Sequence, residues 1–227
     1  MAKSIIITGA SGNLGGAVTK RLVADGFALH TTLVPNEKAP EHPQISGKQV
    51  DLLNENDCKA YVQEVAGNGS EIQAGILLVG GFQPGGLADT DLAGLDKMFK
   101  MNFYTAFTMV KALMAHFEQK GGGQIILIGA RPGLEPKDGK NAVAYALSKS
   151  LIFRLAEIIN QTGKDKNIHA TVIVPSTIDT PINRQAMPDV DPHKWVPAGS
   201  IADAIAFLLT DSGSMLRETV IKVYNNA

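Results

Sequence analysis

Short apolar runs alternate along the chain with longer stretches in which apolar residues recur every three or four positions. The short runs predict buried strands, and the longer pattern predicts amphipathic helices. Strands are expected near 5–7, 28–34, 49–51, 76–79, 125–128, 170–174 and 219–223. Helices are expected near 14–22, 55–66, 92–117, 143–161 and 201–209. Because several strands are apolar throughout, the alternation predicts a doubly wound, mostly parallel α/β sheet with helices on both faces.

No internal repeat, low-complexity segment or linker interrupts this pattern, so we expect one domain over residues 1–227. The longest irregular regions are predicted at 35–48, 129–142 and 175–199. In a doubly wound fold, ligands bind outside the carboxyl ends of the strands, where such loops emerge. We therefore expect the functional site at that edge of the sheet.

A glycine-rich turn directly follows the first predicted strand. Its glycines have the spacing G-x-x-G-x-x-G and lead into an amphipathic helix. Such glycines let the backbone approach a pyrophosphate closely, and the helix N-terminus offers free N–H groups to the anion. This context predicts a dinucleotide site, and the alternative is a glycine turn without a ligand. The predicted cofactor-binding residues of the turn are Gly9, Ser11, Gly12, Asn13, Leu14 and Gly15.

The end of the second strand normally distinguishes NAD from NADP. An acidic residue there binds the ribose 2′-hydroxyl, whereas a basic residue accepts a 2′-phosphate. Residues 30–36 contain no Asp, Glu or Arg, and Glu37 and Lys38 just beyond them favour opposite answers. The sequence therefore leaves the cofactor as NAD(P)H. Asp51, after the third predicted strand, either meets the adenine amino group or is a turn or helix-capping carboxylate.

Tyr145 and Lys149 are four residues apart in a predicted helix, so they share one face. A free phenol has a pKa near ~10, and a neighbouring ammonium group lowers that pKa. The pair therefore predicts a proton donor to a reduced carbonyl or imine. The alternative is one packed aromatic residue beside one solvated charge.

Composition narrows the function further. The formal net charge is −1 and no dense Lys/Arg run is present, which argues against nucleic acid as a partner. Cys58 is the single cysteine, so an internal disulfide and a thiol-rich metal site are excluded. No apolar run is long enough to span a bilayer, and we expect a soluble cytoplasmic protein without membrane contact. No metal is expected, because no two histidines have ligand spacing among His30, His42, His116, His169 and His193.

With these motifs in order, the chain resembles the short-chain dehydrogenase/reductase family over nearly its whole length. The resemblance implies a Rossmann-type parallel sheet of about seven strands. It also implies hydride transfer between a nicotinamide cofactor and a small-molecule substrate. The motifs that carry it are the glycine turn, Asp51, Gly80-Gly81, Asn102, Tyr145/Lys149 and the stretch from Pro175 to Thr180.

The resemblance also assigns roles. Tyr145 would be the proton donor, and Lys149 would lower its pKa and hold the nicotinamide ribose. Asn102 would bend the long helix and keep a proton-relay water. Further cofactor contacts are implied at Gly80, Gly81, Pro175, Ile178 and Thr180. Because family members usually pair their long helices across subunits, a homodimer or homotetramer is expected.

One position departs from the family pattern. Members usually carry a serine after the fifth strand, where this chain has Ala130. The dihydropteridine reductases of the family share the Gly-Ala-basic stretch, and they reduce a quinonoid substrate that accepts hydride readily. The resemblance therefore implies a quinonoid, dihydropterin-like or carbonyl substrate. Two alternatives remain: Ser176 or Thr177 substitutes for the serine, or the chain is a silent dinucleotide sensor.

Four residues are candidates for substrate contact: Ala130, Arg131, Phe82 and Trp195. The aromatic side chains could stack on a planar substrate, or they could anchor their loops to the core. Arg131 could bind the substrate or a cofactor phosphate, or it could form a surface salt bridge. The spacing of Phe99, Phe103 and Phe107 predicts a core or subunit-interface stripe.

Overall fold

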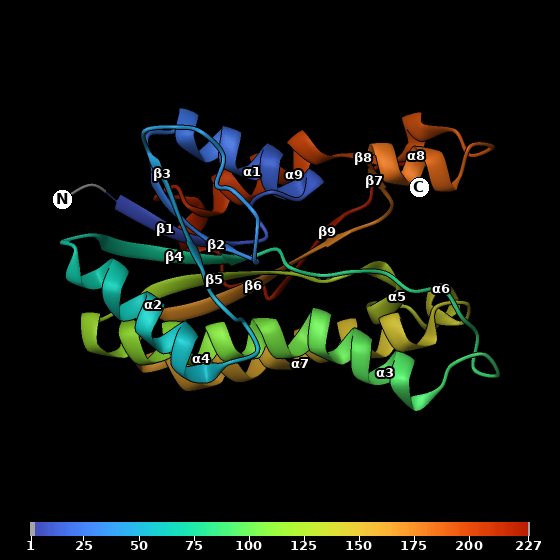
Figure 1. Ribbon diagram of the computed structural model, residues 1–227, viewed down its shortest axis with the longest axis horizontal. Helices are drawn as coiled ribbons and strands as arrows, with labels where there is room; N and C mark the ends of the chain where they lie inside the picture. The colour runs from blue at the N-terminus through green and yellow to red at the C-terminus, as the bar shows by residue number, and fades with distance from the viewer. Residues whose placement is uncertain (1–2, 227) are drawn as a thin grey trace.

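The computed structural model describes residues 3–226, and residues 1, 2 and 227 of the predicted domain lie outside them. Seven parallel strands form the central sheet in the order β3-β2-β1-β4-β5-β6-β9 (Figure 1). The predicted doubly wound parallel α/β fold is therefore confirmed. The strands are β1 (Lys3–Thr8), β2 (Ala28–Leu33), β3 (Ile45–Gln49), β4 (Glu71–Leu77), β5 (Gly123–Ile128), β6 (Ile168–Pro175) and β9 (Val220–Val223).

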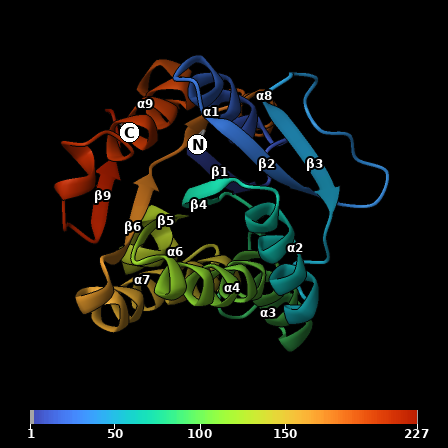
Figure 2. The ribbon, with the colours of Figure 1, turned by 90° about the vertical axis from the view of Figure 1, so that its left-hand side faces the viewer.

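Helices cover both faces of this sheet. Figure 2 shows α1 and α9 on one side and α2, α4 and α7 on the other. Alternate residues of a strand point to opposite faces, so Ile5 and Ile7 pack towards α1 and α9, whereas Ile6 packs towards the other helices. The main helices are α1 (Asn13–Ala24), α2 (Glu55–Gly67), α3 (Leu92–Phe99), α4 (Thr105–Lys120), α7 (Val143–Gly163) and α9 (Ala198–Leu208).

The predicted long helix is interrupted by one wide turn. Between α3 and α4, the segment Lys100–Tyr104 is a π-helix with Asn102 at its centre. A π-turn shifts the side chains that follow it relative to a regular helix, and such turns often lie at functional sites. The helical course predicted from 92 to 117 is thus correct, with a distortion at the residue expected to cause one.

The third strand was predicted wrongly at 49–51, because β3 spans Ile45–Gln49. It is an edge strand whose residues are mostly exposed, so its sequence has no apolar run that would reveal its position. The predicted loops also contain short elements that local patterns do not reveal. These are α5 (Arg131–Leu134), α6 (Pro136–Gly139), α8 (Pro181–Ala186), and the paired strands β7 (Ile178–Asp179) and β8 (Val196–Pro197).

Strand order places the ligand-binding edge. β1 pairs with β2 on one side and β4 on the other, so the chain reverses its winding direction between β1 and β4. Loops at the carboxyl ends diverge at such a reversal and leave a crevice. The turn after β1 and the segment after β4 emerge there, beside the loops that follow β5 and β6. Among residues 3–226, no helix has the length and apolar character needed to cross a membrane.

Candidate active site

Tyr145 and Lys149 lie one turn apart on α7, as predicted. The Lys149 side chain is 5% exposed, and its ammonium group donates a hydrogen bond to the Ile128 carbonyl oxygen, 2.9 Å away. Burial lowers the pKa of Lys149 to about 8 and raises the pKa of Tyr145 to about 12. The net shift of the Tyr145 pKa is therefore upward, opposite to the lowered pKa that the sequence predicted, because desolvation of the phenol outweighs any effect of the lysine. The phenol is held protonated near neutral pH, which suits a proton donor.

Asn102 connects the π-turn to both neighbouring segments. Its amide oxygen accepts from the Gly81 N–H at 2.8 Å, and its amide nitrogen donates to the Gly81 carbonyl at 3.1 Å. The same nitrogen donates to the Ser148 hydroxyl at 3.0 Å, and that hydroxyl donates to the Tyr145 carbonyl at 2.8 Å. Asn102 and Ser148 are both buried. Asn102 therefore fixes the loop after β4 relative to the helix that carries Tyr145.

Gly80 and Gly81 line the approach to this centre. A Cβ atom on Gly80 would lie 2.8 Å from the Asn102 amide oxygen and 3.1 Å from the Lys149 amine nitrogen. A Cβ atom on Gly81 would lie 2.1 Å from the sulfur of Met101. Any side chain here would therefore collide with the residues around the lysine, which leaves the backbone free for a ligand to approach closely.

The glycine turn packs against the same region. Gly9 has φ +72°, and a Cβ atom there would lie 3.0 Å from the Val79 backbone nitrogen. A Cβ atom on Gly15 would lie 2.1 Å from the Gly9 carbonyl oxygen, so α1 can sit against the turn only with glycine there. Asn13 and Leu14 begin α1, and no side chain caps its N-terminus. Its free N–H groups are thus available to an anion, as predicted.

One cavity joins these features. It has a volume of about 230 Å³ and runs along the carboxyl ends of β1, β2 and β4. Val50, Leu52 and Leu78 supply apolar walls, and Gly9 and Gly12 supply exposed backbone. Gly80, which borders Lys149, lines it as well. The apolar walls fit the adenine of a dinucleotide, and the glycine turn fits its pyrophosphate. Lys149, next to Gly80, fits the nicotinamide ribose.

Comparison with known proteins identifies the family. The family profile described as short chain dehydrogenase matches residues 3–191. The chain belongs to the short-chain dehydrogenase family. It is therefore an oxidoreductase of a family that typically depends on NAD(P). Among residues 3–226, no group of three or more His, Cys, Asp or Glu residues is arranged to hold a metal ion.

Relatives of this family differ in the substrates their names indicate. The dihydropteridine reductase of Dictyostelium discoideum is 26% identical over 222 residues, which cover 94% of this chain and 90% of that protein. The 7alpha-hydroxysteroid dehydrogenase of Bacteroides fragilis is 27% identical over 191 residues, covering 79% of this chain and 73% of that protein. The solved structure "ElxO with NADP Bound" is 17% identical with a TM-score of 0.86, covering 98% of this chain and 97% of that one. The last similarity shows the fold.

The remaining residues predicted to contact the cofactor lie at the end of β6 and in the segment that follows it. Pro175 ends β6, and Ile178 pairs with Val196 between β7 and β8. Thr180 caps α8, because its hydroxyl oxygen accepts from the Asn183 N–H at 3.2 Å. The Asn183 side chain donates to the Ile178 carbonyl at 2.8 Å, so that carbonyl already has a partner.

Asp51 takes the role of a turn carboxylate. Its side chain is exposed and accepts from the Leu53 N–H at 2.9 Å, while Asn54 caps α2. Asp51 does not line the cavity, although Val50 and Leu52 on either side of it do. The structure therefore favours the turn over the predicted adenine contact, because the local hydrogen bond holds the carboxylate.

The substrate candidates divide into two groups. Phe82 is 64% exposed and lies edge-on to Tyr145 with 5.1 Å between ring centroids, so it can form a wall beside the phenol. Trp195 is only 3% exposed, which favours anchoring of its loop over stacking on a substrate. Arg131 pairs with Asp138 at 2.9 Å and lies over the Tyr224 ring at 5.5 Å, which favours the salt-bridge alternative. Ala130 is buried beside it, at the N-cap position of α5.

Sequence reasoning missed two residues. Ser148 was not among the predicted site residues, yet it joins the helix of Tyr145 to Asn102. Glu37 was taken as ambiguous between NAD and NADP, yet it lines the cavity. The sequence signal that could have revealed Glu37 is Pro35-Asn36 just before it, because Pro-Asn is typical of a tight turn that reverses the chain.

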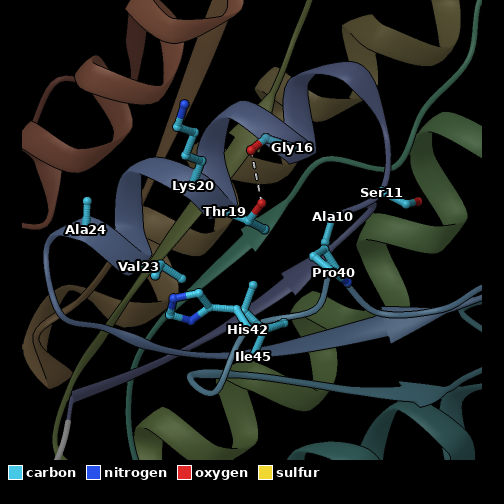
Figure 3. A pocket seen from close by; sticks show the side chains of 10 residues that line it. All are labelled: Ala10, Ser11, Gly16, Thr19, Lys20, Val23, Ala24, Pro40, His42 and Ile45. Carbon is cyan, nitrogen blue, oxygen red and sulfur yellow. Dashed lines mark hydrogen bonds between the residues drawn. The ribbon is translucent and has the colours of Figure 1, made fainter.

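A larger cavity lies on the other side of the glycine turn and contains neither Tyr145 nor Lys149. It has a volume of about 470 Å³ and lies between α1 and the β2–β3 loop (Figure 3). Apolar side chains dominate its wall, among them Val23, Pro40 and Ile45. Unlike the smaller cavity, it is not lined by Gly80, the residue that borders Lys149, and this separates it from the active site.

Proposed function

We propose that this enzyme uses NAD(P)H to reduce a small quinonoid, dihydropterin-like or carbonyl substrate, with Tyr145 as proton donor. The observation that carries the proposal is the half-buried, protonated phenol of Tyr145 one helix turn from the buried Lys149, with Ala130 at the position of the usual serine. A bound nicotinamide supplies the hydride. The chain's own residues supply orientation and the proton.

Tyr145 gives its phenolic proton to the atom that gains negative charge on reduction. Lys149 is largely protonated near pH 7, since its pKa is about 8, and its charge stabilises the phenolate left behind. Asn102 and Ser148 hold the tyrosine helix in place through the Tyr145 carbonyl. Phe82 presents an apolar ring beside the phenol, which suits a planar substrate.

The hydroxyl groups of Ser176 and Ser148 are engaged elsewhere. The Ser176 hydroxyl donates to the Tyr224 carbonyl at 2.7 Å. The Ser148 hydroxyl donates to the Tyr145 carbonyl and accepts from Asn102. These contacts support a reaction without a serine, which a quinonoid substrate tolerates because it accepts hydride without strong polarisation of its oxygen. The 26% identity to a dihydropteridine reductase supports the same substrate class.

The test is an absorbance assay of both reduced cofactors with quinonoid dihydropterin and with a panel of aldehydes and ketones. We expect oxidation of the cofactor with the quinonoid compound at a higher kcat/KM than with simple ketones. Preference for ketones would favour the ordinary carbonyl reductase. Cofactor binding without turnover across the whole panel would favour the sensor.

We also propose that the chain assembles as a homodimer or homotetramer in the cytoplasm. Tyr104 and Phe107 on the long helix are each 41% exposed, and Leu147 and Ile158 on α7 are 47% and 55% exposed. Exposed apolar residues on two adjacent helices suit a subunit interface. Light scattering coupled to size exclusion would measure the molar mass, and a monomer at micromolar concentration would contradict the assembly.

A further inference from the structure

The loop after β2 returns to the glycine turn through a tight turn at residues 34–37. Asn36 has φ +68°, and the Glu37 N–H donates to the Val34 carbonyl at 3.1 Å. Proline at the second position and a left-handed asparagine at the third are typical of a type II turn. This geometry reverses the chain and directs Glu37 back towards the carboxyl end of β2.

Two donors hold the Glu37 carboxylate in that position. One oxygen accepts a hydrogen bond from the Ser11 hydroxyl, and the other accepts from the Val34 N–H at 2.9 Å. Ser11 belongs to the glycine turn, so the carboxylate connects that turn to the end of β2. Each carboxylate oxygen accepts more than one hydrogen bond, so both can still accept from a ligand.

Glu37 lies between the glycine turn and the apolar wall of the 230 Å³ cavity. Glu37 lines the same cavity as Gly9 and Gly12 on one side and Val50 and Leu52 on the other. In this fold the ribose of the AMP half joins the pyrophosphate at the glycine turn to the adenine. A carboxylate between those two places would face the ribose hydroxyls of a bound dinucleotide.

The charge on the wall of this cavity is negative. Of the described residues that line this cavity, Glu37 alone is charged. Thr32, near the end of β2, is 5% exposed and carries no charge. Lys20 and His42 line the neighbouring cavity instead, and the Lys20 side chain extends away from His42 there (Figure 3). Among residues 3–226, therefore, no cation lines the 230 Å³ cavity.

We infer that Glu37 selects NAD(H) over NADP(H), taking from a loop turn the role that an acidic residue at the strand end has in relatives. Its carboxylate accepts hydrogen bonds from the ribose hydroxyls of NAD(H) and repels the 2′-phosphate of NADP(H). The inference rests on the proposed function as an NAD(P)H-dependent reductase. It decides which cofactor that enzyme uses.

Fluorescence titration of the purified chain with NADH and with NADPH, without any substrate, tests this inference. We expect the Kd for NADPH to exceed that for NADH by on the order of 100-fold, from a lost charged hydrogen bond and added repulsion. In Glu37→Gln the ratio of the two Kd values should fall by about tenfold or more. In Glu41→Gln, which removes an exposed carboxylate from the same loop, the ratio should stay at the wild-type value.

The ratio separates selectivity from general damage, because a disturbed loop weakens both cofactors together. Tighter binding of NADPH by the wild-type chain, or an unchanged ratio in Glu37→Gln, would overturn the role of Glu37 and leave the reductase intact. Binding of neither cofactor would overturn the proposed function itself, and this inference with it.

Discussion

The side-chain amide of Asn102 donates a hydrogen bond to the Ser148 hydroxyl across 3.0 Å, and this buried contact joins the π-turn to the tyrosine helix. This hydrogen bond has a structural role rather than a chemical one. Together they set the position of Tyr145 relative to the Gly80-Gly81 segment. The active site is therefore held by a polar link inside an apolar core.

That link predicts a coupled loss of stability. Asn102→Ala should lower the free energy of unfolding by about 2–4 kcal/mol, because Gly81 and Ser148 lose buried partners. Ser148→Ala should cost about 1–2 kcal/mol. The double variant should cost less than the sum, with a coupling energy of roughly 0.5–3 kcal/mol. Urea unfolding of the four proteins measures this cycle, and strict additivity would contradict the link.

Two adjacent glycines of α1 should respond in opposite ways to alanine. In Gly15→Ala the new Cβ meets the Gly9 carbonyl oxygen at 2.1 Å, so the helix must move off the turn at a cost of about 1–3 kcal/mol. In Gly16→Ala the new Cβ meets nothing within 4 Å, and stability should rise by about 0.5–1 kcal/mol. Thermal unfolding gives both values. Equal effects at the two positions would refute the close packing of turn and helix.

His169 should make the fold sensitive to acid. Burial, aided by the charge of Arg217, lowers its pKa from the ordinary 6.5 to about 4, and among the described residues neither ring nitrogen finds a hydrogen-bond partner. The unfolded chain therefore takes up a proton below pH 6.5 that the folded chain takes up only near pH 4. Stability should fall as the pH falls through this window, by up to roughly 3 kcal/mol, and this contribution should not change further below it.

The variant His169→Gln isolates the contribution of His169 to the pH dependence of stability. Its stability should fall less steeply between pH 6.5 and 4 than that of the wild type, when both are measured by urea unfolding. Identical slopes would show that His169 does not contribute, whatever the stability of the variant at neutral pH.

Phe82 should affect the substrate rather than the cofactor. Removing its ring in Phe82→Ala takes away the wall beside Tyr145, so KM for the substrate should rise by about tenfold. The Kd for the reduced cofactor should stay within about twofold. Phe207→Ala, which removes another exposed ring from α9, should change neither constant. A higher Kd for the cofactor in Phe82→Ala would place the ring in the cofactor site instead.

The sequence predicted the elements whose patterns are local. Six of the seven strands were located by their apolar runs, and the glycine turn and the Tyr145–Lys149 pair were identified by spacing. The strand β3 escaped because it is an exposed edge strand without such a run. Periodicity detects burial, and this strand is held by backbone pairing with β2 rather than by burial of its side chains.

Burial also explains where chemistry was misjudged. A sequence shows that Lys149 is near Tyr145, but the pKa of the phenol depends on how far both are removed from water. Trp195 could not be assigned to core or pocket without the packing around it. Glu37 reaches the pocket from beyond the strand end, which only the turn geometry reveals.

The central claim is that Tyr145 donates the proton in this enzyme, and Tyr145→Phe tests it most directly. The variant keeps the ring that contacts Phe82 and removes only the phenolic oxygen. Turnover of the best substrate should fall by about 10²–10⁴-fold. The Kd for the reduced cofactor, measured by fluorescence titration on the same preparation, should stay within about threefold of wild type. Turnover at the wild-type rate in Tyr145→Phe would contradict the account.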